Sequence, residues 1–275
     1  LTATPCRGDG RPMGERYEAL VLGATYSELI ASGNVAEPIV FAPRVSPDMT
    51  GIRRVAGDWA DAEVERVMGS IVGNIVPTWV EHAAGRPTIC FASGIRHSQD
   101  IAARFQDAGI AAEHLDGTTP SAERAAMLER LASGQTTVIS NCAVLTEGFD
   151  APNVRCVISA RPTLSLVLHM QTAGRGLRPG EVQPVILDHA GNVARHGMPH
   201  EDRVWSLTGD VVRPKQKSPY RTCEKCFAYY LAREPKCPIC GTAPTVVERE
   251  LPVETSEKME RVAHVDIERD FYISC

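Results

Sequence analysis

Three side chains in the second half of the chain have the types and the spacing to hold phosphate. Gln171, Arg175 and Arg178 follow one another at intervals of four and three residues, so a helix would present all three on one face. Guanidinium groups are permanently charged planar donors that match phosphate oxygens, and two of them one turn apart can neutralise the charge that develops during phosphoryl transfer. The alternative is an ordinary surface helix with solvated arginines.

The segment from Leu145 to Asp150 lies about one strand and one crossover upstream and fits the same chemistry. Gly148 lets the backbone approach a ligand closely because it carries no Cβ atom, and Asp150 can accept a ribose hydroxyl or orient an arginine. Together the two segments favour phosphate chemistry over a merely solvated helix.

These two segments resemble motifs V and VI of the superfamily 2 nucleic-acid helicases and translocases. The first five residues, 1–5, resemble motif III of that family, and residues 88–94 stand where its motif IV falls. The resemblance covers roughly residues 1 to 210, with the motifs in the family's order. Among these helicases the chain is most similar to the DEAD/DEAH-box type found in bacteria and their phages, which the 187–192 segment and the cysteine-rich tail also fit.

The resemblance implies an ATP-dependent motor that uses ATP with Mg²⁺. It assigns Gly148 and Asp150 to the nucleotide side of the cleft and Arg175 and Arg178 to the triphosphate, with Gln171 assisting; one of the two arginines would be the arginine finger. A search of all 275 residues finds neither the phosphate-loop pattern nor the Asp-Glu pair of the family's first lobe. We therefore expect a piece of a longer protein whose N-terminal RecA-like lobe is the missing partner, and no ATP hydrolysis by this chain alone.

The apolar pattern predicts strands that alternate with helices, and hence a RecA-like α/β fold with a parallel sheet covered on both faces. The expected strands are residues 38–41, 88–91, 111–115, 137–140, 156–159 and 184–187, and the expected helices are residues 16–32, 61–82, 98–108 and 120–133. Pro120 would be the first residue of the last helix, after Thr119 as its N-cap, and Gly134 would end it.

Ligands of such sheets gather beyond the carboxyl ends of the strands. Four residues in those loops are the candidates for contacts to nucleic-acid phosphate: Ser93, Gly94, Asn141 and Thr146. Their types also favour turns, so simple turn chemistry is the alternative for each. The pairs His114/Asp116 and Asp188/His189 also follow strands, and we interpret them as hydrogen-bonded structural groups rather than as catalytic dyads.

A second strong pattern is two Cys-x-x-Cys pairs separated by ten residues, formed by Cys223, Cys226, Cys237 and Cys240. This spacing predicts a closed tetrahedral site for a structural Zn²⁺, and the scattered remaining cysteines argue against a disulfide framework. Around the cysteines lie basic residues and the aromatic residues Tyr220, Phe227, Tyr229 and Tyr230. These aromatic rings could stack on a nucleic-acid strand or form the core of the small module, and the sequence does not decide between the two.

The family resemblance and the composition divide the chain into five parts. They are the end of helicase lobe 1 (1–45), an inter-lobe connection (46–60), the C-terminal RecA-like domain (61–212), a zinc ribbon (213–245) and an acidic tail (246–275). The formal net charge of -5 argues for local rather than bulk electrostatic binding of nucleic acid.

We expect a cytoplasmic protein, since no apolar run approaches the roughly 20 residues that cross a bilayer, so no membrane partner is predicted. The family analogy favours DNA over RNA as the partner. The competing hypothesis is a non-catalytic binding scaffold with a degenerate helicase lobe and a zinc ribbon.

Overall fold

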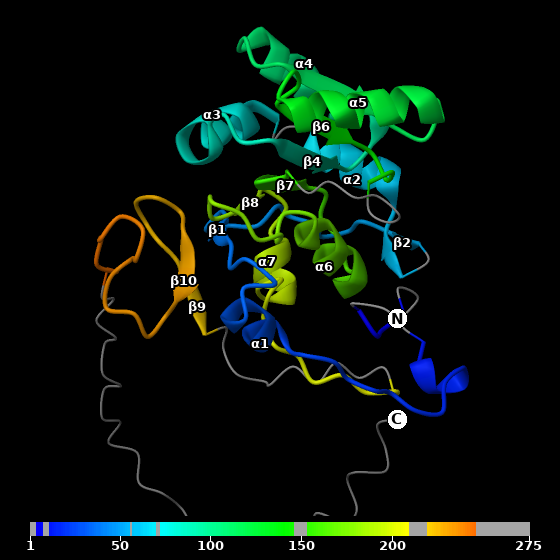
Figure 1. The fold of residues 1–275 in the computed structure, drawn as a ribbon, viewed down its shortest axis with the longest axis vertical. Helices are drawn as coiled ribbons and strands as arrows, with labels where there is room; N and C mark the ends of the chain where they lie inside the picture. The colour runs from blue at the N-terminus through cyan, green and yellow to red at the C-terminus, as the bar shows by residue number, and fades with distance from the viewer. Residues whose placement is uncertain are drawn as a thin grey trace, which may run out of the picture. The chain divides into compact units, whose positions relative to one another are not determined.

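The expected strands form a six-stranded sheet in which every neighbouring pair is parallel. A computed structural model describes residues 4–7, 11–55, 57–69, 72–145, 153–208 and 219–245, and in it the strand order is β1-β8-β7-β4-β6-β5 (Figure 1). The strands are β1 (Ile39–Phe41), β4 (Thr88–Ala92), β5 (Ala112–Leu115), β6 (Val138–Asn141), β7 (Cys156–Ala160) and β8 (Val185–Asp188). The predicted parallel α/β fold is confirmed.

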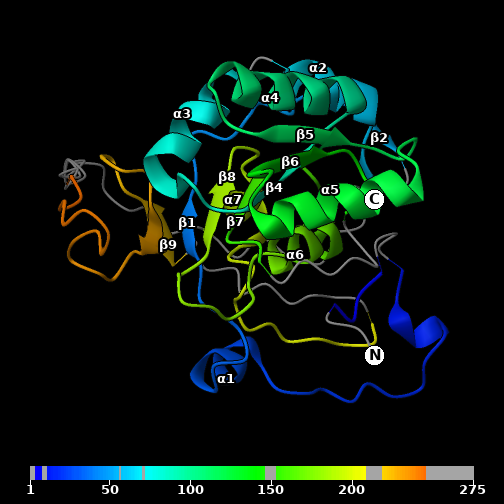
Figure 2. The ribbon, with the colours of Figure 1, turned by 45° about the horizontal axis from the view of Figure 1, so that its top comes forward.

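Helices cover both faces of this sheet because successive side chains of each strand point to opposite sides (Figure 2). One face packs against α3 (Val72–Ala83) and α4 (Ile95–Asp107), which bring Trp79 and Phe105 to a core shared with Cys90 and Ile158. The other face packs against α5 (Ser121–Ser133), α6 (Leu166–Gly174) and α7 (Asn192–His196). The central strands β4, β6 and β7 are buried throughout, which explains their continuous apolar runs.

The first strand of the sheet lies outside the domain boundaries that the sequence predicted. Residues 39–41 were expected at the end of lobe 1, but β1 pairs in parallel with β8 and forms one edge of the present sheet. Val40 and Phe41 are buried, one on each face. A short apolar run specifies a strand but not its partner, and this limit accounts for the difference. Residues Leu1–Pro244 belong to one compact unit.

The helices N-terminal to β4 are shorter than the periodicity predicted. The helix expected over residues 16–32 is only α1 (Tyr26–Ala31), which Thr25 and Glu28 begin with a reciprocal capping box, and a single 3-10 turn (Met13–Glu15) precedes it. The helix expected over residues 61–82 is two helices, α2 (Asp61–Met68) and α3. The polar face of an extended segment can imitate helical spacing, so the pattern overestimated the first of these helices.

Two other helices differ from prediction by a few residues at their starts. Helix α4 begins at Ile95 rather than near Ser98, and α5 begins at Ser121 with Pro120 as its N-cap rather than as its first residue. Gly134 ends α5 as predicted, in a left-handed conformation with φ of 79°.

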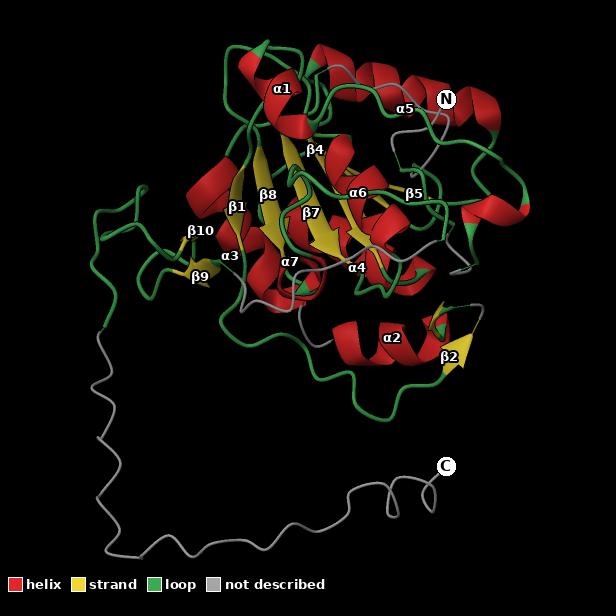
Figure 3. Ribbon diagram, turned by 90° about the horizontal axis from the view of Figure 1, so that it is seen from below, coloured by secondary structure: helices red, strands yellow, loops and turns green. Residues whose placement is uncertain are grey.

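The connection between β1 and α3 folds across the carboxyl ends of the strands. It holds a hairpin of β2 (Arg54–Val55) and β3 (Asp58–Trp59), followed by α2, and Figure 3 shows β2 and α2 beyond the arrowheads of the sheet. A further two-stranded ribbon, β9 (Tyr220–Thr222) and β10 (Tyr229–Leu231), precedes and follows the first cysteine pair. Among the described residues, none of the helices combines the length and the apolar character that crossing a membrane requires.

Candidate functional site

Gln171 lies on helix α6, which ends at Gly174 with Arg175 as its C-cap, so Arg178 lies beyond the helix. Ser165 caps its start by accepting a hydrogen bond from the Leu168 N–H at 3.2 Å. The helix ends at Gly174, and Arg175 continues into turns closed by bonds over three residues. The prediction that one helix presents all three side chains is therefore wrong for Arg178, because the last turn tightens and the chain leaves the helix axis.

The three side chains nevertheless line one groove, which has a volume of about 310 Å³. Met170, Gly174 and Leu177 from the same segment also line it, together with residues far away in the sequence: Thr4, Tyr26, Asn34 and Val35. Thr4 belongs to the opening segment that resembles motif III, so the structure brings the first and the last of the predicted motifs together. Two guanidinium groups and an amide thus line one groove, and these are groups that bind anionic ligands in proteins.

Gly176 fixes the turn between the two arginines against the sheet. A Cβ atom added at Gly176 would lie 2.9 Å from Cγ2 of Val157, a residue of β7 that is 1% exposed. Only a residue without a side chain allows the backbone to come this close. The Leu177 carbonyl accepts a hydrogen bond from the Ala36 N–H at 2.8 Å, which ties the same turn to the segment that precedes β1.

Ser93 and Gly94 lie between β4 and α4, at the carboxyl edge of the sheet. The Ser93 hydroxyl is 2.6 Å from Nδ1 of His97, and both side chains are buried. Burial lowers the pKa of His97 to about 4, so this imidazole is neutral at pH 7. Gly94 is the N-cap of α4, and the carboxylate of Glu65 lies so close that an added Cβ atom would collide with it.

The carboxylate of Glu65 binds at the start of α4, which shows that this helix N-terminus can hold an anionic group. The carboxylate accepts a hydrogen bond from the His97 N–H at 3.0 Å, and the exposed N–H groups of a first helical turn favour negative charge. Two further carboxylates of the β3–α2 region bind groups that follow β7: Asp61 pairs with Arg161 at 2.9 Å, and Asp58 accepts from the Leu164 N–H at 2.7 Å. Sequence reasoning missed these anion-binding groups, although they directly follow a predicted strand.

Asn141 is fully buried at the end of β6, and both ends of its amide are occupied. Its Nδ2 donates to the Cys90 carbonyl at 2.8 Å, and its Oδ1 accepts from the Leu145 N–H at 3.3 Å. These bonds fix the loop that follows β6. The other predicted residues of this loop, Thr146, Gly148 and Asp150, lie outside the described residues.

Of the two His/Asp pairs, His114, Asp116 and Asp188 are part of hydrogen-bond networks, whereas Nε2 of His189 is buried without a hydrogen-bond partner among the described residues. Nδ1 of His114 lies 2.7 Å from the Ser98 hydroxyl and Nε2 lies 3.1 Å from Asp116, an order that resembles a hydrolytic triad. Ser98 is completely buried, however, so no substrate can reach it. Hydrogen bonds from Thr118 and His114 lower the pKa of Asp116 to about 2. Asp188 accepts the N–H groups of Ala190 and Val193, which fixes the loop after β8.

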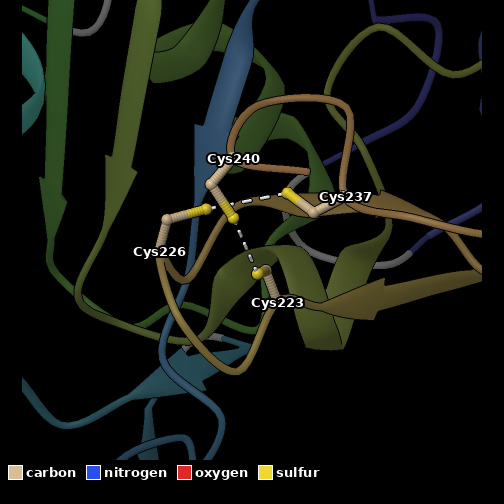
Figure 4. Close-up of side chains that lie close together, drawn as sticks. All are labelled: Cys223, Cys226, Cys237 and Cys240. Carbon is tan, nitrogen blue, oxygen red and sulfur yellow. Dashed lines mark hydrogen bonds between the residues drawn. The ribbon is translucent and has the colours of Figure 1, made fainter. Parts of the chain in front are cut away.

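The four predicted cysteines converge into one centre (Figure 4). Their sulfur atoms all lie within 4.8 Å of one another, with 3.5 Å between Cys223 and Cys240 and 3.6 Å between Cys226 and Cys237. A tetrahedral Zn²⁺ with bonds of about 2.3 Å requires sulfur separations of about 3.8 Å, whereas a disulfide requires about 2.05 Å. Hydrogen bonds from Thr242 lower the pKa of Cys240 to about 6, which favours the thiolate. This arrangement suits a metal and not a disulfide.

The cysteine module, residues 219–245, packs against the edge of the sheet at β1. Cys223 and Cys237 belong to the same buried cluster as Phe41 of β1 and Ala228, and Phe41 forms an isolated antiparallel bridge with Ala228. Of the aromatic residues, Tyr230 is buried under Arg221, and Tyr220 stacks on Tyr229 at 5.5 Å. These three tyrosines serve the packing of the module.

A six-stranded parallel sheet with an arginine-lined groove beside it is the architecture of a RecA-like helicase lobe. Residues 70–180 match the family described as the helicase conserved C-terminal domain. Residues 70–180 therefore correspond to a helicase C-terminal domain, and the sheet to which they contribute has the RecA-like fold.

The chain is also similar to two curated proteins. The chain is 30% identical over 268 residues to a 51.5 kDa protein of Lactococcus phage isolate 7-9, covering 95% of this chain and 59% of that protein. It is 31% identical over 218 residues to a Schizosaccharomyces pombe protein assigned as the mitochondrial ATP-dependent helicase Irc3, covering 77% of this chain and 36% of that protein. The chain thus spans only part of the length of both relatives.

One of the similar solved structures is a fragment assigned as the HsdR subunit of a type I restriction enzyme from Vibrio vulnificus. It superposes with a TM-score of 0.55 at 18% identity and covers 77% of this chain and 45% of that one. At this identity the likeness concerns the fold alone.

Proposed function

We propose that this chain supplies the second motor lobe of an ATP-dependent superfamily 2 DNA helicase or translocase. The observation that carries the proposal is the groove in which Gln171, Arg175 and Arg178 meet Thr4 of the opening segment. In the intact protein, ATP with Mg²⁺ would be held mainly by an N-terminal RecA-like lobe. The present lobe would bring its arginines to the triphosphate when the two lobes close.

In this mechanism Arg178 or Arg175 is the arginine finger, and Gln171 assists. A guanidinium group that reaches the γ-phosphoryl group neutralises charge that is largest in the transition state, so it accelerates chemistry more than it strengthens ATP binding. Because the groups lie on a separate lobe, hydrolysis would require closure, and closure would be coupled to stepping along the nucleic acid. Gly148 and Asp150 complete the nucleotide side in this proposal.

The nucleic acid would follow the carboxyl edge of the sheet. At that edge, hydrogen-bond donors already bind the carboxylates of Glu65, Asp61 and Asp58. The phosphates of a nucleic-acid backbone are also anionic hydrogen-bond acceptors, so they could bind the same donors in place of these carboxylates. Contacts near Ser93, Gly94, Asn141 and Thr146 remain predictions. Since the side chains of Ser93 and Asn141 are buried, the backbone of their loops is the part that would contact phosphate.

The four-cysteine centre would hold a structural Zn²⁺. All four ligands are thiolates of the protein, which leaves no open position for a reacting water molecule. The metal would replace the large apolar core that so small a module lacks.

The test is the Arg178→Ala variant of the intact protein, compared with Arg104→Ala. Arg104 is an exposed arginine of α4, which packs on the opposite face of the sheet from α6. We expect Arg178→Ala to lower the DNA-stimulated kcat by roughly 1,000-fold or more, with little change in ATP binding, and Arg104→Ala to behave as wild type. Unchanged turnover of Arg178→Ala would refute the assignment. An intact protein that binds DNA but hydrolyses no ATP would favour the scaffold hypothesis.

A further inference from the structure

Phe227 has a backbone conformation that its type does not favour. Its φ is 59°, in the left-handed region, where a residue with a Cβ atom is less stable than glycine because the Cβ atom approaches the following carbonyl oxygen. The two cysteine turns share one backbone pattern: the Phe227 N–H donates to the Cys223 carbonyl as the Gly241 N–H donates to the Cys237 carbonyl. Gly241, with φ of 72°, has the residue type that this position favours.

Packing does not explain the phenylalanine, because its side chain is 45% exposed. It is the aromatic residue of this module that faces solvent, whereas Tyr230 is buried and Tyr220 and Tyr229 stack on each other. A strained backbone position that carries an exposed aromatic ring is a reason to look for a ligand.

The backbone around Phe227 is rigidly placed. Its carbonyl accepts a hydrogen bond from the Ala42 N–H at 3.1 Å, and the next residue, Ala228, is 1% exposed and bridges to Phe41. The cysteine turn therefore holds the base of the Phe227 side chain beside the end of β1.

Phe227 lines a cavity of about 330 Å³ between the module, the end of β1 and helix α3. Two further rings line the cavity, those of His82 and Phe41. They stack on each other with ring centres 3.8 Å apart and an angle of 12° between the ring planes. Burial lowers the pKa of His82, so this ring is neutral at pH 7. Polar groups suited to hydrogen-bond a ligand edge come from Asn74, Thr78 and His189. Nε2 of His189 is buried and has no hydrogen-bond partner among the described residues.

The charges around the cavity favour a neutral ring with an anionic tether. Arg44, 59% exposed, lies at the rim and pairs with Glu224 at 3.5 Å. The acidic lining groups are Glu81, which is 69% exposed, and Asp188, which is buried and accepts backbone N–H groups. Because both positively and negatively charged side chains line the cavity, it does not favour a ligand group of either charge. A flat, uncharged heteroaromatic ring with polar edges, attached to a phosphate near Arg44, fits it best.

The cavity opens at the carboxyl ends of β1 and β8, on the same edge as Gly94 and Arg161. The strand order places β1 three strand spacings, roughly 14 Å, from β4. We propose that this cavity receives an unpaired nucleobase of a single strand that runs along the edge, with Phe227 as the stacking surface. The proposal rests on the proposed function in one respect, that nucleic acid follows this edge.

The test measures fluorescence anisotropy of the zinc-loaded protein with a thymidine homo-oligonucleotide and with an abasic backbone of the same length. We expect Phe227→Gly to weaken binding of the oligonucleotide by roughly tenfold or more, and Phe227→Trp to preserve it. The abasic backbone should bind both variants equally. The matched control is Ile239→Gly, which removes an apolar side chain of the other cysteine turn that is 48% exposed.

If Phe227 only stabilised the cysteine module, its replacement would lower the zinc content and the stability of the protein. Since glycine relieves the backbone strain, Phe227→Gly should keep its zinc content and its unfolding midpoint, and a loss of both would overturn the inference. Wild-type affinity of Phe227→Gly would also overturn it, as would equal losses for oligonucleotide and abasic backbone, or specific binding of a peptide in place of the oligonucleotide. If the wild-type protein bound no nucleic acid, the proposed function would fail as well.

Discussion

The turn between the two arginines allows a test of the groove that keeps both guanidinium groups. In Gly176→Ala, the new Cβ atom would lie 2.9 Å from Cγ2 of Val157. Val157 is β-branched, buried and held on a central strand, so its methyl group cannot swing aside. Non-bonded carbon atoms prefer separations of about 3.5–4.0 Å, and the turn must therefore move off the sheet by roughly 0.6–1 Å.

We expect two consequences of that displacement in the intact protein. The free energy of unfolding should fall by about 1–3 kcal/mol, the usual effect of overpacking a buried contact. The DNA-stimulated kcat should fall by up to about 100-fold, because a shift of about 1 Å in a catalytic group can have an effect of this size. Urea unfolding measures the first effect, and a steady-state ATPase assay measures the second.

Gly174→Ala is the matched control, two residues away. Gly174 is the last residue of α6, and an added Cβ atom would meet nothing within 4 Å. Alanine favours a helix by up to about 1 kcal/mol over glycine, so this variant should be as stable as wild type or more so. Because Gly174 itself lines the groove, the variant controls for stability and not for turnover. If Gly176→Ala were as stable as Gly174→Ala and hydrolysed ATP at the wild-type rate, the position of the turn on β7 would have no bearing on catalysis, and the reasoning would be wrong.

Two further predictions concern metal and pH. Chelation of the metal should lower the unfolding midpoint of the whole lobe in calorimetry, because Cys223 and Cys237 share a buried cluster with β1; an unchanged midpoint would contradict this. Burial lowers the pKa of His169 to about 3 and that of His97 to about 4, so only the unfolded chain binds these protons between about pH 6.5 and 4. The contribution of these histidines to stability is complete above pH 6.5 and falls by up to about 1.4 kcal/mol per pH unit for each on acidification; equal stability at pH 7 and pH 5 would count against it.

The sheet could be predicted from the sequence because its central strands are buried on both faces. A continuous apolar run such as residues 88–91 is typical of a fully buried strand when helical patterns of suitable length flank it. The partner of β1 could not be predicted in this way, since pairing depends on the whole sheet. The hairpin β2–β3 was also missed, because strands of only two residues are too short to show a periodic pattern.

The candidate site was predictable to different degrees for each group. The cysteine spacing specified the four-cysteine centre, because each pair shares one tight turn. Ser93 and Asn141 show the limit of such reasoning: small polar residues after a strand serve turns and ligands alike, and only burial distinguishes the two. The exposure of Phe227 among three packed tyrosines could not be read from their order either.

The end of α6 at Gly174 changes what controls the position of Arg178. A side chain on a helix moves with the helix, but Arg178 follows a turn held by two contacts outside α6. One is the approach of Gly176 to Val157, and the other is the bond from the Ala36 N–H to the Leu177 carbonyl. Ala36 belongs to the segment between α1 and β1, which also contributes Tyr26, Asn34 and Val35 to the groove. A displacement of that segment would therefore move the arginine turn and the other lining residues of the groove together, so the position of Arg178 depends on the residues before β1 as well as on α6.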